Sequence, residues 1–211
     1  MLKQLKGMLL EHVALHPMIY LSSAVTFVLA IILGAMTVNI LTLEQLSQMQ
    51  QFFDGFFQNM HQNTIDVNAV FYQSLIEQLR FTILMLVFSL FAVGIPFVLL
   101  CFGIRGYALG FSVGLLVRLM GSKGMLFIVF SQLIHALINI PAAFAMTVIC
   151  LSYAIEKYKC QSKRYGAEST KSKLLRHSLQ ICIVFAFLVS ASLIEGYIVP
   201  VFLKGLSAWF V

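Results

Sequence analysis

Long apolar segments alternate with short polar segments along this chain. The apolar segments are 17–43, 81–104, 106–117, 124–155 and 178–203, and only the last contains a charged residue, Glu195. At about 1.5 Å per residue, a helix over 17–43 is longer than the ~30 Å hydrocarbon core of a bilayer. We therefore predict an all-α, polytopic membrane helix bundle, with about five transmembrane helices in a single integral membrane domain over residues 1–211.

The composition excludes a soluble protein, because 60% of the residues are hydrophobic and only 10% are charged. A net charge of +6 does not indicate nucleic-acid binding here, since half of the 14 lysines and arginines follow one another in one short run. Basic residues beside a span typically meet anionic lipid, so membrane lipid is the expected partner. The four cysteines include no CxxC pair, so we expect neither a metal site nor a cofactor.

The distribution of lysine and arginine predicts the orientation in the cell membrane, because cytoplasmic loops carry the excess. Lys3 and Lys6 place the N-terminus in the cytoplasm, and the basic run makes 156–177 a cytoplasmic loop. Segment 44–79 has four acids but no lysine or arginine, as expected of an extracytoplasmic loop. Five crossings then place the C-terminus outside the cytoplasm.

The third and fourth crossings are the least regular part of this prediction. An even number of crossings is needed between Arg105 and the basic run, which makes 106–120 a short third helix and 124–155 a fourth. Arg118 and Lys123 would snorkel at the outer side. The alternative is a re-entrant pair of half-helices broken near Pro141. Pro96, Pro141 and Pro200 are each expected to kink a helix within the membrane.

The extracytoplasmic loop is predicted to contain an amphipathic helix. Its apolar residues recur at spacings of three and four, namely Leu46, Met49, Phe53, Phe56 and Met60. Thr42 and Gln45 have the spacing of a capping box just ahead of it. The apolar face packs either on the protein's own helices or against a partner.

Glycines recur every fourth residue at Gly106, Gly110 and Gly114, so they lie on one face of a helix. Small residues at this spacing let another backbone approach closely within a membrane. The neighbour is either another helix of the same chain, which we favour, or a helix of a second copy in a homo-oligomer.

Glu195 is the candidate functional residue, because an acid inside an apolar helix is costly and requires a partner or a function. Counting along oppositely directed helices brings His135 to a similar depth, and Asn139 lies one turn further along the same face. We expect these three residues to form an intramembrane polar cluster, either as a structural clamp or as a proton or ion relay. Ser131 precedes His135 by four residues, but no orienting acid accompanies them, so we predict no catalytic residues and no enzyme.

Residues 191–200 (ASLIEGYIVP) resemble the A-x-x-I-E-x-Y-x-x-P signature of the stage II sporulation protein M family. The resemblance extends over most of the chain, through Gly34, Ala35 and Asn39 and through further segments: 94–96 (GIP), 105–116 (RGYALGFSVGLL), 121–127 (GSKGMLF) and 135–142 (HALINIPA). Where the family tends to have glycine and glutamate, this chain has Ala136 and Asn139, which makes an acid-dependent relay at that site less expected.

The resemblance implies a non-enzymatic membrane scaffold in sporulation. Such a scaffold would anchor the peptidoglycan-remodelling enzymes of the engulfment complex, resembling stage II sporulation proteins D and P. These cell-wall hydrolases are the implied protein partners, and the double-phenylalanine pairs of the outer loop are the candidate docking residues: Phe52, Phe53, Phe56 and Phe57. The alternative function is a transporter or channel-like component that uses Glu195 and His135 in a polar intramembrane path.

Overall fold

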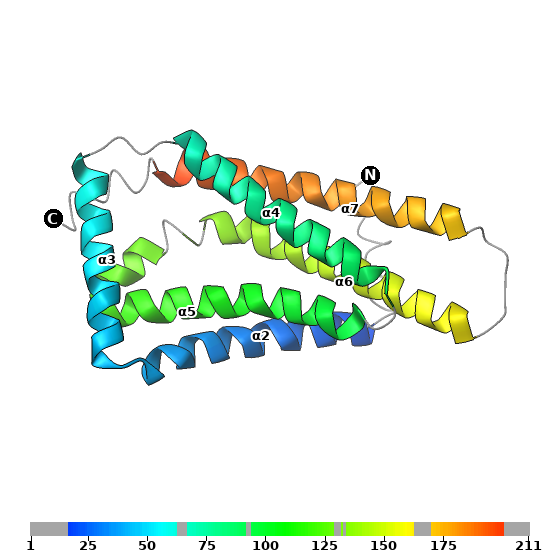
Figure 1. Ribbon diagram of the computed structural model, residues 1–211, viewed down its shortest axis with the longest axis horizontal. Helices are drawn as coiled ribbons and strands as arrows, with labels where there is room; N and C mark the ends of the chain where they lie inside the picture. The colour runs from blue at the N-terminus through cyan, green and yellow to red at the C-terminus, as the bar shows by residue number, and fades with distance from the viewer. Residues whose placement is uncertain are drawn as a thin grey trace.

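The computed structural model describes residues 17–62, 67–91, 94–128, 132, 134–162 and 170–200, and these residues form helices without a strand. The helices are α2 (Pro17–Ile40), α3 (Leu43–Gln62), α4 (Val67–Ser89), α5 (Gly94–Ile128), α6 (Ile134–Ser162), α7 (Thr170–Leu193) and the π-helical turn η2 (Ile194–Ile198). All except α3 run along the long axis of the molecule (Figure 1). The predicted all-α fold class is therefore confirmed.

Five helical stretches are long and apolar enough to cross a membrane: Pro17–Ile40, Val67–Ser89, Gly94–Gly121, His135–Lys157 and Leu174–Ile198. Successive spans point in opposite directions, and α3 lies crosswise over one end of the bundle (Figure 1). The C-terminal end of α6 and the N-terminal end of α7, which flank the basic run, lie at the opposite end (Figure 1). Helix α3 and the basic run are thus on opposite sides of the spans.

The second and third spans differ from the sequence prediction. Helix α4 starts at Val67, inside the segment assigned to the outer loop, and the chain turns at 90–91 where 81–104 was expected to be one helix. Arg105, expected at a span boundary, therefore lies in the middle of α5. Pro96 does not kink a span, because it occupies the first turn of α5, where a missing N–H costs no hydrogen bond.

The physical reason is that α4 buries polar side chains inside the bundle. Its buried face recurs at helical spacing and consists of Ser74, Gln78, Phe81, Thr82, Met85 and Ser89. Ser89 Oγ lies 2.9 Å from His177 Nε2 of α7, so even this polar residue has a partner. A hydropathy reading treats Ser74 and Gln78 as solvent-facing, whereas both form hydrogen bonds to side chains of other elements of the bundle.

The fourth crossing also begins later than expected. Gly121 has a φ of +57°, a left-handed conformation that suits glycine, and it bends α5 before the helix ends at Ile128. Helix α6 then starts at Ile134 and continues through Pro141. The re-entrant alternative is therefore wrong, because the described chain is continuous α-helix on both sides of this proline.

Helices α2 and α5 pack at backbone distance through glycines. A Cβ atom on Gly106 would lie 2.9 Å from the carbonyl oxygen of Phe27, and one on Gly114 would lie 3.2 Å from Cα of Ala35. One on Gly110 would collide with the backbone of Ile31. The glycine face of α5 therefore packs on a helix of the same chain, as favoured above.

Helix α3 begins with the predicted capping box, which is confirmed. The Thr42 amide donates to Gln45 Oε1 at 3.0 Å, and the Gln45 amide donates back to Thr42 Oγ1 at 3.3 Å. Within the bundle, large side chains fill the core without exposure to solvent, among them Met85, Phe102, Met146, Leu151 and Leu188. Outward-facing side chains of the spans are mostly apolar, as lipid contact requires.

Candidate functional site

A polar cavity of about 260 Å³ lies between α4, α5, α6 and η2. Its polar lining comes from all four elements and from Gln132, which precedes α6. The lining comprises Glu77, Gln78, Arg105, Ser112, Gln132, His135, Asn139 and Glu195. Apolar residues such as Phe27 and Phe102 close its other side. Charged and polar side chains therefore converge at one place inside an otherwise apolar bundle.

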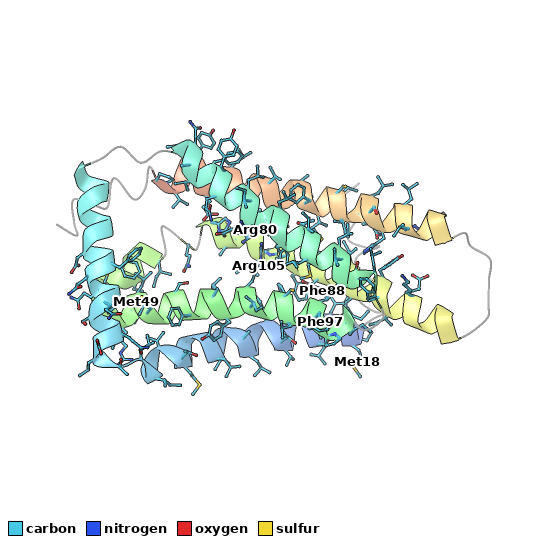
Figure 2. The ribbon with its side chains drawn as sticks, in the orientation of Figure 1. Met18, Met49, Arg80, Phe88, Phe97 and Arg105 are labelled. Atoms are coloured by element: carbon cyan, nitrogen blue, oxygen red, sulfur yellow. The ribbon has the colours of Figure 1, made fainter. Side chains whose placement is uncertain are left out.

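Arg105 anchors the cavity from the middle of α5, and Figure 2 shows it near the middle of the bundle. Its Nη1 donates to Asn139 Oδ1 at 3.1 Å, and its Nη2 donates to Gln78 Oε1 at 2.7 Å. The guanidinium carbon also lies 3.7 Å from the ring centroid of Phe81, as in a cation–π contact. These contacts join α4, α5 and α6 and replace the hydration that the cation loses.

Glu195 of η2 and His135 of α6 also meet at this cavity. His135 Nε2 lies 3.2 Å from Glu195 Oε2, and Ser74 Oγ donates to the same oxygen at 2.6 Å. The Glu195–His135 approach is at ion-pair distance but lacks the direction of a hydrogen bond, since Nε2 is buried without a hydrogen-bond partner among the described residues. Asn139 does not join this pair, because its amide oxygen accepts from Arg105 instead.

The local backbone explains how Glu195 reaches Ser74. Residues 194–198 form a π-helical turn, and such turns are frequent at functional sites in helices. The next residue, Gly196, is buried against α4: a Cβ on it would lie 2.7 Å from Cβ of Phe71. Without a side chain there, η2 and α4 approach closely, so that Glu195 meets a residue one turn along α4.

Glu77 is the second acid of the cavity, and its side chain is exposed. It therefore lies at the open side of the cavity wall, whereas Arg105 and His135 lie further inside. Both Glu77 and Glu195 are near enough to interact electrostatically with Arg105. The cavity thus combines one permanent cation, two carboxylates and one titratable imidazole.

The side chains of the polar cavity are arranged for binding. In the described part of the chain, no three histidine, cysteine or acidic side chains are placed to hold a metal ion together. Ser131, the serine considered with His135 above, lies outside the described residues. The groups that are placed can hold a proton or a small polar ligand.

Sequence reasoning missed Ser74, Glu77, Gln78 and Arg105. A signal was present in the spacing, because Ser74, Gln78 and Phe81 lie on one helical face that continues to Met85. The obstacle was that Glu77 and Arg80 made this stretch read as a loop. A polar face inside a span is recognisable only when a complementary residue such as Arg105 is assigned to a neighbouring helix.

The candidate docking phenylalanines of α3 differ in how exposed their side chains are. Phe52 is 69% exposed, whereas Phe53 packs against Leu116, Ile128 and Val199 of the bundle. The side chains of Phe56 and Phe57 lie outside the described part of the structure. One face of α3 is therefore used for self-packing, and Phe52 is presented outward.

Comparison with known proteins gave one family. The family model described as stage II sporulation protein M matches residues 23–200, which include every residue of the polar cavity and the whole of α3. Neither curated proteins nor solved structures gave a match.

Proposed function

Because the chain belongs to the stage II sporulation protein M family, a family of sporulation membrane proteins, we propose that it is a non-enzymatic scaffold of the engulfment complex. In this role it anchors cell-wall hydrolases that resemble stage II sporulation proteins D and P. The bundle holds the anchor in the cell membrane, and its partners carry out the cleavage of peptidoglycan.

The position of α3 is the observation that supports this proposal. The helix lies across the end of the bundle opposite the basic run (Figure 1). Lysine and arginine collect on the cytoplasmic side, so α3 would face the cell wall, the compartment in which the hydrolases act. The same rule would put the N-terminus inside and the C-terminus outside.

Phe52 is the proposed contact residue. Its neighbour Phe53 packs against the bundle, and the two rings meet edge to face with centroids 5.9 Å apart. Met49, one turn before Phe52 on α3, is also exposed and extends the apolar surface along the helix. An exposed aromatic side chain on a held helix is a typical anchor for an interface, since it loses little conformational entropy on binding.

Capture of the hydrolases tests the proposal. A tagged copy would be purified from sporulating cells as the F52A variant and, as a matched control on the same helix, as the exposed-site variant Q51A. We expect F52A to recover at least about tenfold less hydrolase, equivalent to about 1.4 kcal/mol of binding. Equal recovery with F52A and wild type would contradict α3 as the docking element.

A second function, transport or channel-like conduction, is favoured by the polar cavity alone. Glu195 and His135 would then line a path, as the ionisable residues of transporters do. Flux of protons or small solutes into reconstituted vesicles, lost in E195Q, would support it. Absence of flux with folded wild-type protein would reject transport, and the cavity would then serve ligand binding or stability.

A further inference from the structure

The charges that line the cavity do not balance when His135 is neutral. Arg105 supplies one positive charge, and Glu77 and Glu195 supply two negative charges when both are ionised. These groups and His135 are all the titratable side chains that line it in the described residues, from α4, α5, α6 and η2. Within a membrane span, an uncompensated charge is costly. We propose that the cavity binds one small monovalent cation, in competition with a proton on His135.

Unused acceptor atoms support a cation as the ligand. Gln132 Oε1 is buried and has no hydrogen-bond partner among the residues that the structure describes. Both contacts of Glu195 use Oε2, so among the described residues its other oxygen accepts no hydrogen bond. Neutral His135 presents a lone pair at whichever ring nitrogen is not protonated. Oxygen acceptors without donors are what a cation or its water shell requires.

The size and depth of the cavity agree with a hydrated ion. Its volume of about 260 Å³ exceeds the ~30 Å³ that one water occupies several times over, so an ion fits with part of its water shell. Direct coordination of a divalent metal is not supported, because no group of three ligating side chains is found among the described residues. Arg105 lies about 16 Å along α5 from Gly94, at about 1.5 Å per residue, which is close to mid-span.

Helix irregularity marks the same place. Glu195 belongs to the π-helical turn, and Pro141, two residues after Asn139 in the continuous helix α6, lacks the N–H that would donate to the preceding turn. Ion sites of membrane proteins are typically built near mid-span where helices depart from regular geometry. Glu77, exposed at the open side, would attract the cation, and Glu195 would hold it.

Thermal unfolding in a neutral detergent tests the proposal. Melting temperature would be measured with sodium, potassium or ammonium chloride against N-methylglucamine chloride at constant ionic strength. At a cation concentration about ten times its Kd, we expect the melting temperature to be about 3–6 °C higher than in N-methylglucamine chloride. The rise should shrink as the pH is lowered and His135 takes up a proton, because that proton supplies the same charge.

Two variants identify the site, with a matched control. E195Q should abolish the cation-specific rise, and Q132M, which removes the unpartnered oxygen without changing charge, should weaken the apparent affinity at least about threefold. E44Q removes a carboxylate from exposed α3 and should behave as wild type. If E195Q does not fold, Q132M decides alone. The proposal is overturned if wild type shows no cation-specific rise, if only pH matters, or if both variants respond as wild type does.

Discussion

Arg105 and Gln78 are joined by a 2.7 Å hydrogen bond between the middle of α5 and the buried face of α4. This bond and the one to Asn139 hold three helices around one cation. They help to explain why α4 can place polar residues inside the bundle: Ser74, Gln78 and Ser89 each meet a polar side chain of another helical element. The contacts of Arg105 are therefore part of the fold, because its loss would leave Gln78 and Asn139 without their donor.

Replacing Arg105 should destabilise the protein more than replacing an exposed arginine. R105M leaves Gln78 and Asn139 without their donor, and hydrogen bonds to charged groups contribute about 1.5–3 kcal/mol each. We expect the melting temperature in neutral detergent to fall by about 5–10 °C. R105K, which keeps the charge but not the planar fork, should lie between R105M and wild type.

Arg80 provides the matched control for that comparison, because it lies on α4 with an exposed side chain. R80M should change the melting temperature by no more than about 2 °C. Equal effects of R105M and R80M would show that the Arg105 contacts do not hold the bundle together.

A methyl group at Gly110 should force α2 and α5 apart. Its Cβ would overlap the carbonyl of Ile31, which is backbone and cannot rotate away. Overpacking of this kind typically costs about 1–3 kcal/mol, so G110A should melt several degrees below wild type. Gly55 on α3 has no atom within 4 Å of the position that a methyl group would occupy, and G55A should be neutral or slightly stabilising because alanine favours helix. A neutral G110A would refute close backbone packing of these helices.

Removal of the capping box should loosen the start of α3. T42A deletes the acceptor of the Gln45 amide, and loss of such a cap costs about 1 kcal/mol. Amide hydrogen exchange in the first turn of α3 should then be about fivefold faster. Thr37 of α2 bonds only to a carbonyl of its own helix, so T37A should leave α3 exchange unchanged. Unchanged exchange in T42A would indicate that bundle contacts, and not the cap, fix the helix.

Apolar length and charge placement were sufficient to predict the fold class and the number of spans. Pro17–Ile40 is recognisable because its length and hydropathy leave one interpretation. The boundary between the second and third spans could not be located in this way, since Glu77 and Arg80 lower the hydropathy of α4. Its polar face becomes favourable only through contact with Arg105, a residue 27 positions away from Gln78.

The candidate site was predictable in part: the sequence identified the residues that lie near one another, but not all of their partners. An acid in an apolar segment identified Glu195, and helix direction brought it near His135, where the structure has the two side chains 3.2 Å apart. Asn139 shares the face of His135 but bonds to Arg105. Helical spacing gives the face of a residue, but the choice between two partners depends on side-chain reach across helices.

The side of the membrane on which α3 lies is the central claim, because both the scaffold role and the docking residue depend on it. In a variant without the native cysteines, one exposed serine at each end would be replaced: S47C on α3 and S172C on α7. Intact cells would be treated with a membrane-impermeant maleimide. The account predicts labelling of S47C and protection of S172C until the cells are permeabilised. Labelling of S172C with protection of S47C in intact cells would contradict it.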